Sequence, residues 1–241
     1  MRNASEQITC ASCRNFFGAI TASLSHEMNN VLAIVNELAG LQEDVLAAAD
    51  EGRPLSPEKL RSISSRIAQQ VQRGKGFVKQ LNRFAHSVDH ASTQMDVREE
   101  LERGIALNQR FARLRKVGLE LRAPEATFSV QGCPFDVQHL VFSSIEIGLG
   151  VAAEGATLIV TLCGRDDGVD ITLTVERAGE CDPAAPAAEH PAEKLTYLRL
   201  LAEQLGGTCE GRLGAGDPAT LTLRLPAVLA GFEDAEESEE S

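Results

Sequence analysis

Apolar side chains recur every three or four positions along residues 17–85, which is the spacing of amphipathic helices. The first series is Phe17, Leu24, Met28, Val31, Val35, Leu38 and Val45. The segment AADEGRPL at residues 48–55 interrupts the pattern, and Ser56 with Pro57 then provides an N-cap and a first-turn proline. The second series is Leu60, Ile63, Ile67, Val71, Val78, Leu81 and Phe84 or Ala85. Two long helices joined by a short loop predict an antiparallel hairpin.

A lone hairpin of this kind would bury only one stripe of each helix and would have no closed core. Two copies related by a twofold axis would complete a four-helix bundle, so the apolar pattern predicts a homodimer. We assign residues 1–92 to this helical domain.

From residue 93 the pattern becomes that of an α/β domain. Alternating apolar residues predict strands at TQMDV, GLELRAP and TFSVQG. Two further pairs of strands predict hairpins: ATLIVTLC with VDITLTVE around Arg165-Asp166-Asp167-Gly168, and TCEGRL with ATLTLRLP around GAGDP. Helices are predicted after an N-cap at Asp96, from Pro134 to Ala152, and from about Ala192 to Gly206. This order predicts one mixed sheet covered by one helix layer over residues 93–228.

Charge and composition narrow the functions that such a chain can have. The formal net charge is −12, and six of the acidic residues lie in the last ten positions, so residues 229–241 are expected to form a solvated acidic tail. The remainder has no basic face, which argues against nucleic-acid binding. No apolar run approaches the ~18 residues of a membrane span, and the N-terminus lacks a signal-peptide core, so a cytoplasmic location is expected.

The six cysteines are expected to be thiols in that compartment. Cys10 and Cys13 have the CxxC spacing of a metal site, but no second cysteine pair and no paired histidines complete one. We therefore interpret them as a reduced pair near the start of a helix, and no metal site is predicted.

The stretch SLSHEMNNVLAI places a histidine, an acid and two asparagines in the first helix. Because Leu24 and Met28 belong to the apolar series, His26 is predicted to face solvent. Asn30 lies beside it at i+4, and Glu27 is turned toward the flank of the bundle. A neutral imidazole can attack a phosphoryl group when a carboxylate holds its other ring nitrogen as N–H, and an amide nearby could orient water. Taken alone, these residues favour an idle surface histidine, because histidines on helix surfaces are common, and they supply too few ligands for a metal.

The segment SLSHEMNNVLAIVNE resembles the phospho-acceptor box of sensor histidine kinases, and LNRFAHS resembles the end of the second helix in the same hairpin. VQGCPFDVQHLVFSSIEIGL, AEGATLIVTLCGRDDGVDITLTVE, LRLLAEQLGGTCEGR and TLTLRLP follow the order of that family's GHKL-type ATP-binding domain. The resemblance implies a dimeric four-helix bundle followed by an α/β sandwich. It also implies that His26 is phosphorylated, that Glu27 is its acid partner, and that Asn30 positions water for dephosphorylating a partner.

The resemblance also reveals departures in the nucleotide pocket. The family's Mg²⁺-binding asparagine positions fall on Ser143 and Ile147, and an isoleucine cannot coordinate a hard cation, although Ser143 and Glu146 offer oxygens nearby. The adenine-binding aspartate falls on Glu176, which is one methylene longer.

Glycines are missing from the same pocket. Ala178 replaces the first glycine of the adenine-binding box. The phosphate-binding glycines are replaced by HPAEKLTYLRLL, and no glycine occurs between Gly179 and Gly206. The domain is therefore expected to fold without binding a nucleotide.

Three functions follow, in order of preference. The first is phosphotransfer, in which His26 exchanges a phosphoryl group with the aspartate of a response-regulator receiver domain and needs no cofactor; the same face would suit a phosphatase. The second is an active histidine kinase core that phosphorylates His26 from ATP and Mg²⁺. The third is a non-enzymatic dimeric scaffold. The expected partners are a receiver domain, a second copy of the chain and, in a phosphorelay, an upstream kinase.

Overall fold

The computed structural model divides the chain into two compact units, and each is described by itself. The first unit is residues 17–86, and the second joins the residues up to 16 with those from 87 onward. The structure describes residues 4–89, 92–176, 191–213 and 218–230, with side chains from Ser12 onward apart from Pro191. Within this part of the chain, no helix is long and apolar enough to cross a membrane.

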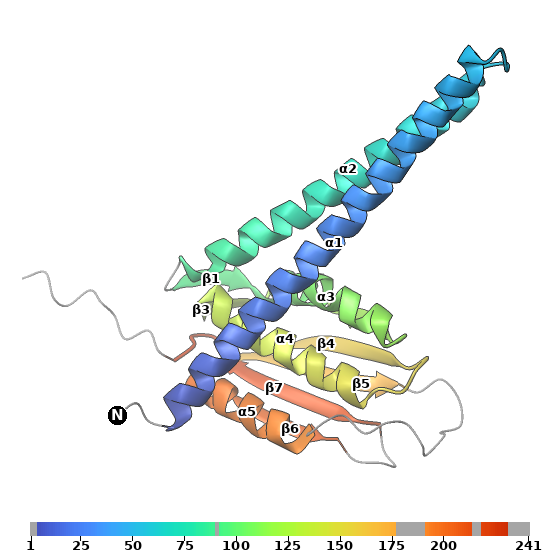
Figure 1. Cartoon of the computed structure of the whole chain (residues 1–241). Helices are drawn as coiled ribbons and strands as arrows, with labels where there is room; N and C mark the ends of the chain where they lie inside the picture. Colours follow the sequence, from blue (N-terminus) through green and yellow to red (C-terminus); the bar gives the residue numbers. More distant parts are fainter. Residues whose placement is uncertain (1–3, 90–91, 177–190, 214–217, 231–241) are drawn as a thin grey trace, which may run out of the picture. The chain divides into compact units, whose positions relative to one another are not determined.

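The first unit is the predicted helical hairpin. Helix α1 (Ala4–Asp50) and helix α2 (Pro57–Ala85) run side by side in Figure 1, and the first part of α1 belongs to the second unit. The predicted start of α2 is confirmed, because Ser56 Oγ accepts a hydrogen bond from the backbone N–H of Lys59 at 3.3 Å. Pro57 follows at the first helical position, where no intrahelical N–H is required.

Packing inside the hairpin follows only part of the predicted series on each helix, since Phe17 at the start of the α1 series is 45% exposed. Val31 and Leu38 of α1 are each 3% exposed, whereas Val71 and Val78 of α2 are 43% and 44% exposed. At this level α2 presents Gly74 to α1, where an added Cβ would lie 3.3 Å from Cγ1 of Val31. The missing side chain of Gly74 lets the helices approach closely, and the two valines stay exposed in a single chain. Their predicted place against a second copy stays a prediction.

The second unit contains a five-stranded sheet with the order β2-β4-β5-β7-β6. Its strands are β2 (Gly118–Arg122), β4 (Thr157–Arg165), β5 (Gly168–Glu176), β6 (Thr208–Arg212) and β7 (Thr220–Pro226). Strand β2 pairs with β4 in parallel, and the other neighbours are antiparallel. The predicted hairpin between β4 and β5 is confirmed, because Arg165 pairs with Gly168.

Two other strands form a separate sheet. β1 (Thr93–Asp96) and β3 (Ser129–Gly132) pair with each other in antiparallel fashion, and Gln131 of β3 also forms a parallel bridge with Val228. A 3-10 turn, η1 (His86–Val88), precedes β1. The alternating pattern predicted both strands but not this pairing, because alternation marks a strand's two faces and does not identify its neighbour.

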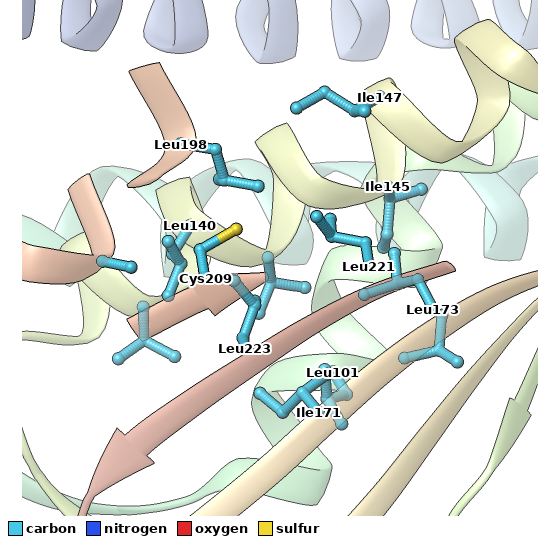
Figure 2. Close-up of a cluster of buried hydrophobic side chains, with 14 of the residues drawn as sticks. Leu101, Leu140, Ile145, Ile147, Ile171, Leu173, Leu198, Cys209, Leu221 and Leu223 are labelled. Atoms are coloured by element: carbon cyan, nitrogen blue, oxygen red, sulfur yellow. The ribbon is translucent and has the colours of Figure 1, made fainter. Parts of the chain in front are cut away.

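Three helices cover the main sheet: α3 (Val97–Leu114), α4 (Pro134–Val151) and α5 (Pro191–Gln204). Figure 1 shows them on one side of it. Asp96 caps α3 as predicted, accepting from the N–H of Arg98 at 3.0 Å. Figure 2 shows side chains from helices and strands meeting in one core, among them Leu140, Ile145, Leu198, Leu221 and Leu223. The predicted helical hairpin followed by a mixed sheet with a helix layer is confirmed; the predicted tail lies almost entirely outside the described residues.

Candidate functional site

The predicted phospho-acceptor lies on the surface of the hairpin. His26 is exposed on α1, as its place relative to the apolar series predicts. Asn30 is also exposed, one helical turn later on the same face. The imidazole is therefore open to a large reactant such as another protein domain, with an amide beside it.

Glu27 is the buried member of this group. The residue is only 6% exposed, and its Oε2 accepts a hydrogen bond from Nη2 of Arg73 on α2 at 2.8 Å. The carboxylate thus lies inside the hairpin rather than at its flank, and the guanidinium compensates its charge. A carboxylate buried in this way requires such a partner, because an unpaired buried charge is strongly destabilising.

Arg73 was not identified by the sequence pattern. Its guanidinium carbon lies 5.5 Å from the ring centroid of Phe77, which is one helical turn further along α2. The side chain is 41% exposed, so the guanidinium is fixed on one side by Glu27 and the aromatic ring, and faces solvent on the other. The sequence offers one local signal for Arg73. Glu27 lies beside the apolar series of α1, and an acidic side chain in that place needs a cation from the opposite helix.

The positions assigned to Mg²⁺ by the resemblance lie on α4. Ile147 is 4% exposed and belongs to the hydrophobic core, where Figure 2 shows it. Ser143 is half-buried, and Oε1 of Glu146 accepts a hydrogen bond from Nζ of Lys194 on α5 at 2.7 Å. An apolar side chain and an ion-paired carboxylate do not form the set of oxygen ligands that a hard cation requires.

Glu176, the residue assigned to adenine, is the last residue of β5. Its side chain is 56% exposed, and Oε1 accepts from Nη1 of Arg122 on β2 at 3.5 Å. Ala178 and Gly179 lie outside the described residues. Among the residues that are described, no three histidine, cysteine or acidic side chains cluster as a metal site would require.

A second histidine, not singled out by the sequence, lies in a polar cluster of the second unit. His139 on α4 is 1% exposed, and Phe16 stacks on its ring. Nε2 lies 3.3 Å from Oγ of Ser12 and 3.5 Å from the hydroxyl of Tyr197, and Nδ1 lies 3.8 Å from Sγ of Cys13. Burial lowers the pKa of His139 to about 4, so the ring is neutral at pH 7.

The cysteines with described side chains form no metal cluster. Cys13 contacts His139, while the side chain of Cys10 lies outside the described part of the chain. The four cysteines with described side chains form no disulfide; they are Cys13, Cys133, Cys163 and Cys209.

A cavity of about 400 Å³ lies at one end of the main sheet. It is lined by Arg165, Asp167, Gly206, Gly207, Thr208, Arg224, Leu225 and Pro226. Both arginines are already paired: Nη2 of Arg165 lies 2.5 Å from Oδ1 of Asp167, and Nη1 of Arg224 lies 3.0 Å from Oε1 of Glu210. The cavity therefore offers no uncompensated cation to a phosphate, and no residue assigned to the nucleotide lines it.

No protein-family model and no curated protein matches this chain. Solved structures that match include a histidine kinase from Burkholderia phymatum, with 17% identity over 85% of this chain and 98% of that one, at a TM-score of 0.48. The histidine kinase AdeS from Acinetobacter baumannii matches with 12% identity over 79% of this chain and 95% of that one, at a TM-score of 0.45.

A third match is described as a bacterial phosphotransferase, with 18% identity over 87% of this chain and 95% of that one, at a TM-score of 0.41. These three structures are described as two histidine kinases and a phosphotransferase. At these identities and TM-scores the chemistry of this chain rests on its own residues.

Proposed function

We propose that this protein is a histidine phosphotransfer protein, which accepts a phosphoryl group on His26 from a receiver-domain aspartate and passes it on. The observation that supports the proposal is an exposed imidazole whose sequence neighbour is a buried, arginine-paired carboxylate. This combination leaves the nucleophile accessible and supplies a fixed negative charge next to it.

The reaction uses only groups of the two proteins. One ring nitrogen of His26 attacks the phosphorus of an aspartyl phosphate, a nitrogen–phosphorus bond forms, and the aspartate carboxylate leaves with the electrons of the broken phosphorus–oxygen bond. Glu27 stabilises the positive charge that develops on the ring. The reverse reaction transfers the group to a second receiver, and in this proposal Asn30 orients a water that hydrolyses it.

The phosphoryl donor in this proposal is a protein rather than ATP. The residues at the family's Mg²⁺ positions do not fit the ion, because Ile147 lies in the core and Glu146 is paired with Lys194. No step of the reaction is therefore assigned to a nucleotide or a metal. The hairpin is proposed to act as a homodimer, with Val71 and Val78 facing the second copy.

The test is transfer from receiver domains phosphorylated with acetyl phosphate. We expect acid-labile phosphate on the native protein and none on a His26→Gln variant, while His86→Gln, at an exposed histidine at the end of the same hairpin, remains labelled. If no receiver in a broad panel labels His26, the scaffold function replaces this proposal.

A parallel incubation with labelled ATP and Mg²⁺ addresses the kinase alternative. We expect no incorporation, and calorimetry with a non-hydrolysable ATP analogue should give no heat of binding. Labelling by ATP that disappears in His26→Gln would contradict the protein donor and establish a kinase core with a divergent pocket.

A further inference from the structure

We propose that Arg73 is a positioning residue for phosphoryl transfer at His26: it anchors the Glu27 carboxylate from the opposite helix and so determines how that carboxylate acts on the imidazole. The inference rests on the proposed function of His26 and adds a residue from α2, a helix to which neither the motif nor the resemblance assigns a role in the chemistry.

The first support is the geometry of the ion pair. Glu27 Oε2 and Arg73 Nη2 are 2.8 Å apart, a short charge-assisted hydrogen bond between helices, and the Glu27 side chain is only 8% exposed. A carboxylate held in this way has little freedom to move. Glu27 directly follows His26 in α1, so this anchoring fixes the carboxylate one residue away from the nucleophile.

The second support is that the hairpin is constructed to bring the pair together. Gly74 follows Arg73, and an added Cβ there would lie 3.3 Å from Val31 and 3.9 Å from Met28, the residue after Glu27. The close approach of α1 and α2 at this glycine places the Arg73 backbone at the level of Glu27. Phe77 then supports the guanidinium from within α2, with the arginine carbon 5.5 Å from its centroid.

The third support is the choice of arginine. A guanidinium has five N–H donors in a planar fork, and only Nη2 is committed to Glu27 among the contacts described for Arg73. The side chain is 41% exposed, so donors remain on its solvent side. Arg73 can therefore keep its hold on Glu27 when a partner's acidic or phosphorylated site approaches His26.

Two measurements separate positioning from simple stabilisation. The first is the rate at which phosphoramidate phosphorylates His26; here the ring nitrogen attacks phosphorus and the phosphorus–nitrogen bond of the reagent breaks to release ammonia. The second is the ratio of the two neutral His26 tautomers, read from nitrogen-15 spectra. A carboxylate that accepts from one ring N–H favours one tautomer, so this ratio reports on Glu27 without any phosphoryl transfer.

We expect Arg73→Gln to lower the phosphorylation rate on the order of tenfold and to bring the tautomers closer to an equal mixture, because the carboxylate is no longer fixed. Arg73→Lys should bring both the phosphorylation rate and the tautomer ratio part of the way back to the native values, since lysine keeps the positive charge but lacks the planar guanidinium group. Combining Arg73→Gln with Glu27→Gln should lower the rate no further than Glu27→Gln alone. Arg66→Gln, the same substitution at an exposed position two helical turns earlier, is the matched control and should change neither quantity.

The outcomes distinguish this inference from the proposed function. If His26 is phosphorylated normally in Arg73→Gln and its tautomer ratio is unchanged, Arg73 has no positioning role and the phosphotransfer function stands. If native His26 is not phosphorylated by any donor, the proposed function fails, and the tautomer ratio alone decides whether Arg73 acts on His26 through Glu27. The double variant gives a further check. If its phosphorylation rate is lower than that of Glu27→Gln by the full loss seen in Arg73→Gln, the two residues act independently and the inference is overturned.

Discussion

The imidazole of His139 and the ring of Phe16 lie face to face, with their centroids 4.6 Å apart and their planes inclined by 12°. This stack joins the first part of α1 to α4 within one compact unit, and both residues are almost fully buried. A ring enclosed in this way is poorly hydrated, so protonation is opposed by the loss of solvation of the imidazolium.

Stability is therefore expected to depend on pH through His139. The folded pKa of about 4 lies below the ordinary value of 6.5, so the unfolded chain binds more protons between these values, and the contribution of His139 is lost as the pH falls from 6.5 toward 4. From pH 7 to pH 5 the free energy of unfolding should fall by roughly 2 kcal/mol more in the native protein than in His139→Gln.

Comparison of the two proteins is necessary because other buried groups act in the opposite direction. Burial raises the pKa of Glu100 and of Asp136, so the folded state holds these protons more tightly and gains stability as the pH falls. Both carboxyls are present in both proteins and cancel in the difference. The measurement is urea unfolding of both proteins at several pH values. If the free energy of unfolding changes equally with pH in the native protein and in His139→Gln, burial does not lower the pKa of His139.

Truncating Phe16 should destabilise the packing of α4 and increase amide hydrogen exchange along this helix. Phe16 is 3% exposed and packs against Phe135, His139 and Phe142, so Phe16→Ala should destabilise this region by about 3 kcal/mol. Phe17, the next residue, is 45% exposed, and Phe17→Ala should have a much smaller effect. Amide hydrogen exchange along α4 distinguishes the two, and equal loss of protection in both variants would contradict the Phe16 packing.

A pair of helical glycines should respond to alanine in opposite directions. A Cβ on Gly104 of α3 would overlap Cγ1 of Val141 on α4, so Gly104→Ala should be destabilising by about 1 kcal/mol after the gain in helix propensity. Gly76 of α2 has open space at the same atom, and Gly76→Ala should be stabilising by roughly 0.5–1 kcal/mol. Thermal unfolding of both variants tests the sign; stabilisation by Gly104→Ala would contradict the tight contact between α3 and α4.

The exposed valines of α2 should hold two copies together. Val71→Glu with Val78→Glu would place two charges on apolar positions that one hairpin leaves 43% and 44% exposed, and we expect the dimer to dissociate into monomers in light scattering. Leu114→Glu, at a 68% exposed apolar position of α3, should leave the mass unchanged. A native protein that is already monomeric at high concentration would contradict the homodimer.

Much of the fold could be predicted from the sequence because its signals are local. Ser56 and Pro57 define the start of α2, and Arg165 to Gly168 define a hairpin, through the preferences of residues that are adjacent in the chain. The exposure of His26 follows from its angular distance to the apolar series on one helix.

The missed features depend on residues far apart in the chain. Glu27 and Arg73 are 46 positions apart, and Cys13 and His139 are 126 apart, so no periodicity links either pair. Val71 and Val78 fit the helical period yet are exposed in a single chain, because Gly74 and not a larger residue meets α1. Side-chain periodicity cannot reveal where two helices approach most closely.

The parallel pairing of β2 with β4 has a consequence for the order in which the chain folds. The hairpin needs only residues 17–86, all of which leave the ribosome before β2 at Gly118–Arg122 is complete. β2 has no sheet partner until β4 at Thr157–Arg165 has been made, because its pairing requires the crossover through α4. The segment with His26 is therefore expected to fold early during synthesis, and the five-stranded sheet to form in a later and slower step.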